Sequence, residues 1–271
     1  YVFGIALAVV IMMLTVKRKI PDFGAIFFRP GKLSKEIVSY SWPLLFTNFS
    51  LMIFSWADVI VLGLFVSSAL VGIYDVASVT SRLLSIVPLA ISTMFMPAIT
   101  EVFAKDKSRV AGLYLHMSKI ILILLLPMLV FLAIFSKTML VSFFGGEFSA
   151  GTTSLVVLLV GQFFWGWGLL ASNILAASER TKLIFFNTAF SAGVNLILIF
   201  ILIPRVGIIG AAFATAFSLI LAAVLNVAQV AYIVHAKPVN WSFIKPILSI
   251  LVPVSAFALF FRSFIIDVSL V

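Results

Sequence analysis

The chain has 271 residues, of which 63% are hydrophobic and 10% charged, and its formal net charge is +9 at pH 7. Soluble domains average about 25% charged residues, so this composition excludes an ordinary water-soluble domain. The cations lie in short segments between apolar stretches and form no basic patch, which excludes nucleic acid as the expected partner. The absence of cysteine excludes disulfides, thiolate catalysis and cysteine-ligated metals within this chain.

Eight apolar stretches follow one another along the chain. A helix needs about 20 apolar residues to cross the hydrocarbon core of a membrane, and these runs are too long and too continuous for barrel strands. The stretches are 1–16, 43–65, 79–100, 120–136, 153–176, 184–203, 208–235 and 246–264. We therefore expect an all-α fold, a polytopic membrane helical bundle with about eight transmembrane segments.

Lysine and arginine crowd into every second gap between these stretches. Fourteen of the 18 lie in the gaps 17–40, 101–119, 177–183 and 236–245. The intervening gaps, 66–78, 136–152 and 204–207, hold only Lys137 and Arg205. Because positive loops stay in the cytoplasm, the pattern predicts a multi-pass protein of the cell (plasma) membrane with segment 17–40 on the cytoplasmic side.

The longest polar segment, 20–42, is a candidate joint between two lobes. It is too polar to span a membrane, and both a short interfacial helix and an irregular loop fit its sequence. The chain opens inside an apolar run at Tyr1 rather than at a methionine, so we expect a piece of a longer protein. The expected parts are the end of a preceding transmembrane helix (1–16), a cytoplasmic inter-lobe linker (17–42), a six-helix C-terminal lobe (43–236) and an additional transmembrane helix (245–271).

Asp58 is the clearest charged residue inside an apolar stretch. A charge at mid-membrane costs at least ~2.5–3.5 kcal/mol, so its presence is a functional hypothesis by default. One interpretation is a cation or proton site that faces an internal cavity. The other is a carboxyl group that is hydrogen-bonded between helices or protonated.

Arg82 is expected about one turn inside the stretch 79–100. Its partner could be Asp58, Asp75 or an anionic substrate. Arginine also snorkels readily near a helix end, so a purely structural position is the alternative.

A polar stripe runs along the stretch 184–203, where Asn187, Ser191 and Asn195 are spaced at i, i+4 and i+8 and share one face of a helix. Thr215 lies on a similar small and polar face of the next stretch. Amide and hydroxyl oxygens beside a carboxylate are the ligands that a hard cation such as Na⁺ prefers. The alternative is ordinary hydrogen bonding between helices.

No enzymatic constellation is recognisable. His116 and His235 each stand alone, no two carboxylates are suitably spaced, and no phosphate-binding glycine-rich loop occurs. We expect the protein not to be an enzyme and to have no cofactor, apart from Na⁺ or H⁺ as a coupling ion.

Four blocks of sequence resemble one superfamily, the multidrug/oligosaccharidyl-lipid/polysaccharide exporters. The resemblance covers roughly residues 38–236. The blocks are Ser41–Leu45, Asp58–Gly63 with Val71–Tyr74, Phe144–Phe148 and Ile203–Thr215. It implies a two-lobe, all-helical exporter of twelve to fourteen spans, of which this chain holds the C-terminal lobe.

The resemblance also implies a set of site residues. Some lipid-linked flippases of the superfamily hold sodium between an aspartate, residues of a later helix and a threonine, which by motif position are Asp58, Asn195 and Thr215. The second acidic residue of that pattern is Ile199 here, a departure from the family. A cationic residue that meets pyrophosphate corresponds to Arg82, although its spacing to Pro88 is off by one.

The function implied is a flippase that moves lipid-linked oligosaccharide or polysaccharide repeat units across the membrane by alternating access. Its partners would be the lipid-linked glycan, membrane lipid and the missing N-terminal lobe of the same protein. A multidrug or metabolite cation antiporter of the same superfamily is the nearest alternative, and the single intramembrane aspartate with a nearby arginine favours an anionic substrate instead. A membrane-embedded glycan polymerase or ligase, or a non-transporting scaffold, are more distant alternatives.

Overall fold

The computed structural model describes residues 11–12, 14–15, 32–106 and 109–234. The chain divides between Pro43 and Leu44 into two compact units, and the helical bundle analysed below belongs to the second. The predicted stretch 246–264 and the segment 245–271 lie outside the described residues, as do 17–31. Of the stretch 1–16, only the helical residues 11–12 and 14–15 are described.

The described part of the chain contains helices and no strand. Its α-helices in the second unit and across its boundary are α3 (Lys32–Phe65), α4 (Ser68–Ser81), α5 (Ile86–Lys105), α6 (Val110–Ile134), α7 (Ser136–Phe144), α8 (Thr152–Ala177), α9 (Thr181–Val206) and α10 (Ile208–Val234). Two 3₁₀-helices, η1 (Arg82–Ser85) and η3 (Gly146–Gly151), lie between them.

Six segments are long and apolar enough to cross a membrane. They are Ser41–Phe65, Ser68–Lys105, Val110–Ile134, Gly146–Ala177, Thr181–Val206 and Ile208–Ile233. Each corresponds to one of the predicted apolar stretches. The all-α, multi-pass membrane bundle is therefore confirmed over the part of the chain that the structure describes.

The predicted loop 66–78 is wrong, because α4 already begins at Ser68. Tyr74 and Ala77 are both fully buried on one face of α4, so tertiary packing stabilises a helix in a segment predicted only as a gap between apolar stretches. The second span therefore runs from Ser68 to Lys105. Arg82 lies well inside this span rather than one turn from its end.

The segment 20–42 is helical wherever it is described. Helix α3 begins at Lys32 and continues through Pro43 to Phe65, so residues 32–42 form neither a separate interfacial helix nor an irregular loop.

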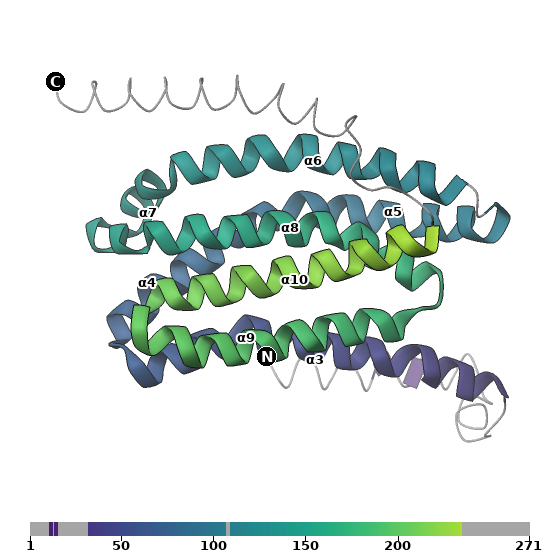
Figure 1. Ribbon diagram of the computed structural model, residues 1–271, viewed down its shortest axis with the longest axis horizontal. Helices are drawn as coiled ribbons and strands as arrows, with labels where there is room; N and C mark the ends of the chain where they lie inside the picture. The colour runs from purple at the N-terminus through teal and green to yellow at the C-terminus, as the bar shows by residue number, and fades with distance from the viewer. Residues whose placement is uncertain (1–10, 13, 16–31, 107–108, 235–271) are drawn as a thin grey trace. The chain divides into compact units, whose positions relative to one another are not determined.

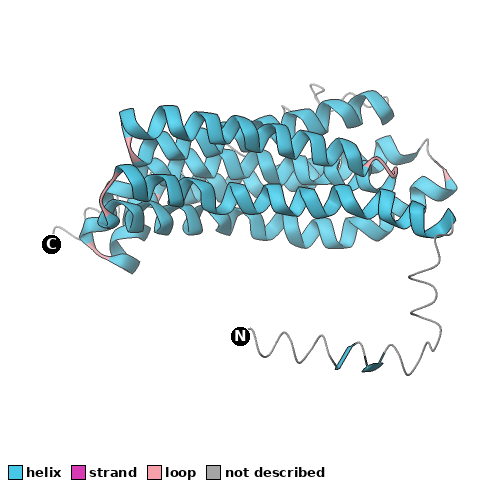
Figure 2. Ribbon diagram, turned by 90° about the horizontal axis from the view of Figure 1, so that it is seen from below, coloured by secondary structure: helices cyan, strands magenta, loops and turns pink. Residues whose placement is uncertain are grey.

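Helix α8 occupies the centre of the bundle, between α6 and α10 (Figure 1). Helix α9 packs on α10. Glycines permit the close approach of α8 and α10: a Cβ atom at Gly161 would lie 2.6 Å from the Cα of Ala216, and one at Gly168 would lie 2.7 Å from the Cα of Ala223. Since both contacts advance by seven residues, the two helices run parallel. Figure 2 shows the long helices of the bundle side by side.

The second span is interrupted near its middle. Helix α4 stops at Ser81, and the four residues of η1 follow it. Pro88 explains the break. It has no N–H to donate to the carbonyl of Leu84, and its ring would clash with that carbonyl in a continuous α-helix. The chain avoids this clash by forming the 3₁₀ turn η1. Helix α5 then begins at Ile86, which places Pro88 in its first turn, where proline is tolerated.

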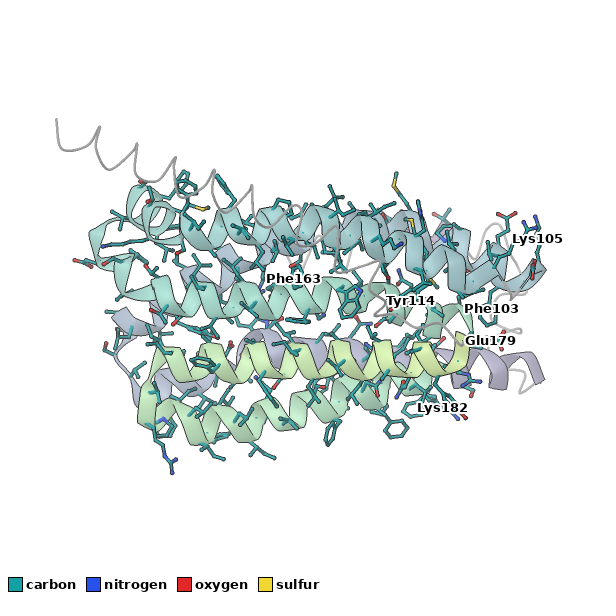
Figure 3. All side chains as sticks on the ribbon, turned by 45° about the horizontal axis from the view of Figure 1, so that its top comes forward. Phe103, Lys105, Tyr114, Phe163, Glu179 and Lys182 are labelled. Atoms are coloured by element: carbon teal, nitrogen blue, oxygen red, sulfur yellow. The ribbon has the colours of Figure 1, made fainter. Side chains whose placement is uncertain are left out.

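The charged loops of the bundle gather at one end. Lys105, Glu179 and Lys182 lie at the same end in Figure 3. The α5–α6 and α8–α9 connections, which the sequence analysis assigned to one side of the membrane, are thus together. The α3–α4 connection, α7 with η3, and the α9–α10 turn lie at the opposite end (Figure 1).

Candidate functional site

Asp58 forms the centre of a buried polar network between helices. It lies on α3 about two turns before Phe65 and is 2% exposed. Its Oδ2 accepts hydrogen bonds from the Tyr74 hydroxyl of α4 and from the Thr215 hydroxyl of α10, the latter at 3.3 Å. Its Oδ1 accepts the backbone N–H of Val59 at 2.9 Å. The carboxyl group therefore joins three helices through three donors.

Asn195 extends this network to a fourth helix, α9. Its side-chain amide donates to Oγ1 of Thr215 at 3.3 Å. Asn195 is fully buried, and its Oδ1 has no hydrogen-bond partner among the described residues. The structure thus brings together Asp58, Asn195 and Thr215, the three residues that the sequence analysis combined, and adds Tyr74.

Apolar side chains enclose the Asp58 network. Val61, Leu62, Leu158 and Ile199 belong to one buried cluster that also contains Tyr74. Ile199, at the position where the resemblance expected a second acidic residue, is fully buried in this cluster. The site therefore holds one carboxyl group in low-dielectric surroundings, where electrostatic interactions are stronger than in water.

The donor set fits a small monovalent cation or a proton better than a divalent metal. One carboxylate, one amide oxygen and one hydroxyl supply hard oxygen ligands with a single negative charge. The described residues contain no group of three or more His, Cys, Asp or Glu side chains that could hold a metal ion. The 3.3 Å between the Thr215 and Asp58 oxygens exceeds the ~2.7–2.8 Å usual for hydroxyl donors, and oxygens at this spacing can face one small cation.

Arg82 lies outside the Asp58 network. It follows the last residue of α4, in η1, and is exposed. It forms no salt bridge with a described acidic residue. Of the partners that the sequence left open for Arg82, Asp58 and Asp75 are thus not in direct ionic contact with it, and the anionic substrate stays a hypothesis.

Asn187 belongs to a second polar cluster. Its amide donates to Oδ1 of Asn226 at 2.7 Å and to Oε1 of Gln229 at 2.9 Å, and its Oδ1 accepts from Gln229 at 2.9 Å. Asn226 in turn donates to the hydroxyl of Ser172 at 2.9 Å. The predicted stripe on α9 therefore divides, because its two asparagines bond to different parts of α10.

Ser191 lies between the two asparagines of the stripe. It is fully buried, and its hydroxyl has no hydrogen-bond partner among the described residues. Ser218 on α10 has the same burial and the same unpartnered hydroxyl. Neither serine makes the bond to the carbonyl four residues earlier that Ser50 and Ser55 make.

A cavity of about 210 Å³ adjoins the second polar cluster. It lies among α3, α8, α9 and α10, and its polar lining comes from Thr47, Ser172, Asn173, Thr188 and Asn226. Trp165 also lines it. All five polar groups are uncharged.

Sequence reasoning missed Tyr74, Asn226 and Gln229. Tyr74 was recognised only as the end of the block Val71–Tyr74 and placed in a loop. Asn226 and Gln229 are three residues apart on an otherwise apolar helix, and that spacing was a signal that both face one neighbour.

The chain is similar to proteins of glycan biosynthesis and to membrane exporters of known structure. It is 33% identical over 216 residues to the probable flippase AglR of Haloferax volcanii, an alignment that covers 76% of this chain and 44% of the relative. The chain therefore spans less than half the length of this curated relative.

Two solved structures share its fold. A multidrug resistance MATE family transporter of the MOP superfamily, in an outward-facing conformation, matches with a TM-score of 0.61 at 22% identity, over 84% of this chain and 53% of the transporter. The lipid II flippase MurJ, in an inward closed conformation, matches with a TM-score of 0.60 at 18% identity, over 82% of this chain and 53% of MurJ.

The bundle therefore has the fold of these exporters, as the sequence blocks implied. The family model described as "Polysaccharide biosynthesis protein" matches residues 2–153. Because this match covers more than half of the 271 residues, the chain belongs to the polysaccharide biosynthesis protein family.

Proposed function

We propose that the protein is a flippase that moves lipid-linked oligosaccharide or polysaccharide repeat units across the cell membrane. Membership in the polysaccharide biosynthesis family and similarity to a probable flippase support this function. The substrate would be a glycan on a lipid carrier, whose tail stays in the bilayer while the headgroup crosses. The protein would act as a transporter rather than an enzyme.

We further propose that the bundle is one of two lobes. The chain covers 44% of AglR and 53% of each solved exporter, which leaves room in such proteins for a second lobe of similar size. Rocking of two lobes around a central site would provide alternating access. The N-terminal lobe of the same protein would then be the chain's principal partner.

The proposal that transport is coupled to an ion rests on the buried Asp58 network. A carboxyl group this deep in a membrane bundle is costly to keep, and three donors from three helices hold it in place. Asp58, Asn195 and Thr215 would hold Na⁺, or Asp58 alone would take up H⁺. The ion would supply the free energy of transport by favouring one orientation of the lobes.

Arg82 is proposed to attract the phosphate groups of the substrate. It is exposed on the bundle although it lies well inside the span Ser68–Lys105. A guanidinium group in contact with lipid tails would be costly at that depth, so it is expected to face water or the other lobe. Its planar donors suit phosphate oxygens.

The test is translocation of a lipid-linked oligosaccharide in proteoliposomes that contain the intact transporter. Asp58→Asn keeps the shape of the side chain and removes its charge. We expect it to lower ion-driven translocation by about tenfold or more, the effect of losing one ionic interaction of ~1.5–3 kcal/mol, with unchanged expression.

Asp75→Asn is the matched control. Asp75 is exposed and immediately follows Tyr74, so its neutralisation should leave translocation near the wild-type rate. Equal activity of the Asp58→Asn and wild-type proteins would contradict ion coupling at Asp58. Export of cationic drugs without glycan translocation would instead identify a multidrug antiporter.

A further inference from the structure

The two polar clusters of the bundle lie at different depths. The Asp58 network joins α9 and α10 through Asn195 and Thr215. The second cluster joins the same helices through Asn187 and Asn226. On α9 the two asparagines are eight residues apart, or about 12 Å along the helix axis.

Buried, unpaired polar atoms occupy the interval between these clusters. Ser191 lies four residues from each asparagine and so shares their face of α9. Ser218 lies one turn from Thr215 on α10, in the direction of Asn226. The hydroxyls of both serines, and Oδ1 of Asn195, are buried without a hydrogen-bond partner among the described residues.

Such atoms are rarely left unpaired in native proteins, and ordered water is their usual partner inside a folded chain. The cost of leaving them dry is higher still among apolar helices in a membrane. Three such atoms lie along α9 and α10 from Asn195 to the second cluster, whose Asn226 and Ser172 line the cavity. They mark a polar route through an otherwise apolar lobe.

We propose that a file of water runs inside the lobe from the 210 Å³ cavity to Asp58, past Ser191 and Ser218, and that it conducts the small monovalent cation which Asp58 binds. The file opens toward the end of the bundle that holds the α8–α9 turn, because Ser172 and Thr188, which line the cavity, lie toward that end of α8 and α9. The loop charges assign that end to the cytoplasm, so an ion that drives transport would leave Asp58 by this path, which is separate from the surface that carries Arg82. This inference rests on the proposed role of Asp58 as an ion site.

Neutral lining suits this role. The cavity and the route contribute hydroxyl and amide groups and no charged side chain. Hydroxyl and amide oxygens replace part of the water shell of a cation without trapping it, whereas a second carboxylate on the way would hold it. The single charge, Asp58, lies at the end of the route.

The test is the reactivity of single cysteines in the intact transporter, in membrane vesicles. These 271 residues contain no cysteine, and any cysteine in the rest of the intact transporter is first replaced by serine. Ser191→Cys and Ser218→Cys are nearly isosteric changes. The probe is a small, positively charged, water-soluble thiosulfonate, added on the face of the membrane from which Lys182→Cys is labelled.

Ala192→Cys is the matched control, since Ala192 is the next residue on α9 and is only 3% exposed. We expect Ser191→Cys and Ser218→Cys to react about tenfold or more faster than Ala192→Cys, because thiol modification requires access to the water-borne reagent. Reaction of both serine positions at the rate of Ala192→Cys would overturn the proposal. So would faster reaction from the opposite face.

The identity of the ion follows from a second arm of the same experiment. Slower modification in NaCl than in choline chloride assigns the route to Na⁺, and equal rates in both salts assign it to protons. Neither arm uses the glycan or measures transport. A hydrated route would therefore stand even if the translocation assay failed, and a dry one would be detected even if translocation succeeded.

Discussion

Tyr74 contributes more to the Asp58 site than its position in the sequence suggests. Its hydroxyl reaches from α4 to the carboxyl group on α3 and is fully buried there. A hydrogen bond to a charged group is roughly twice as strong as one between neutral groups. Tyr74 therefore acts as a positioning residue, which fixes both the carboxyl group and the contact between the two helices.

Replacing Tyr74 by phenylalanine should separate the contribution of the Tyr74 hydroxyl from that of the packed aromatic ring. Tyr74→Phe keeps the ring and removes one donor to Asp58. We expect it to destabilise the protein by about 1.5–3 kcal/mol, the contribution of one hydrogen bond to a charged group, because only Thr215 and Val59 then donate to the carboxyl group. The measurement is the thermal unfolding midpoint in detergent, with and without NaCl, because a changed response to salt would report on the site and not on packing.

Tyr114→Phe provides the comparison. Tyr114 is equally buried, on α6, but its hydroxyl lies near the neutral hydroxyl of Ser118 and not near a carboxyl group. Removal of the Tyr114 hydroxyl should lower the unfolding midpoint less than removal of the Tyr74 hydroxyl does. Equal destabilisation by the two changes would mean that the Tyr74 hydroxyl contributes nothing particular to Asp58.

Among the elements, the pair α8 and α10 is the most tightly packed. Gly161 and Gly168 allow the backbone of α10 to approach so closely that a methyl group at either position would lie within 2.7 Å of an alanine Cα atom. Small residues at such contacts are the usual device for helix association in membranes. The sequence analysis identified a small and polar face on α10, around Thr215, but not its partners on α8.

The substitutions Gly161→Ala and Gly168→Ala should each push α8 and α10 apart. Overpacking of this kind costs about 1–3 kcal/mol, more than alanine recovers through its better helix propensity of ~1 kcal/mol. The expected result is a lower unfolding midpoint for each variant and a lower one still for the double variant.

Gly193→Ala is the control within the same bundle. Gly193 is also helical, on α9, and a Cβ atom there would meet no atom within 4 Å. This variant should be neutral or slightly stabilised. Stabilisation by Gly161→Ala as well would mean that the two helices can separate without cost.

At the scale of the whole molecule, the distribution of cations and the arrangement of helices agree. Arg180 and Lys182 lie in or beside the α8–α9 turn, and Lys105 and Arg109 flank the α5–α6 connection at the same end of the bundle. The opposite end holds Lys137 and Arg205. The positive-inside rule assigns the first of these ends to the cytoplasm.

Two exposed lysines test this orientation. Lys137 is on α7 and Lys182 is at the start of α9, at opposite ends of the bundle. In intact cells, a membrane-impermeant maleimide should label Lys137→Cys, and it should label Lys182→Cys only after permeabilisation. Each variant removes one positive charge, so the two variants have the same net charge and serve as controls for each other. The reverse pattern would invert the topology predicted from the loop charges.

Most of the bundle was predictable because length and hydropathy suffice to locate a membrane helix. The site was predictable only in part. Asp58, Asn195 and Thr215 could be grouped through their motif positions, whereas Tyr74 required knowledge that the segment 66–78 is helical. That segment contains glycine and serine, and the burial of Tyr74 and Ala77 on one face of α4 shows that it packs as a helix. Asn187 could not be separated from Asn195, because the periodicity of one helix does not reveal which residues of a second helix face it.

Helix α4 connects the Asp58 site, through Tyr74, with Arg82. Tyr74 holds one side of it to Asp58, and Arg82 follows its last residue, eight positions and about 12 Å further along. A rigid helix transmits a tilt or a shift along its whole length. Under the proposed function, a cation that draws the Asp58 carboxyl group away from the Tyr74 hydroxyl and thereby shifts α4 would also displace Arg82, which would link occupancy of the ion site to the binding of a phosphate at Arg82. By thermodynamic reciprocity, a phosphate held by Arg82 would in turn change the affinity of Asp58 for its ion.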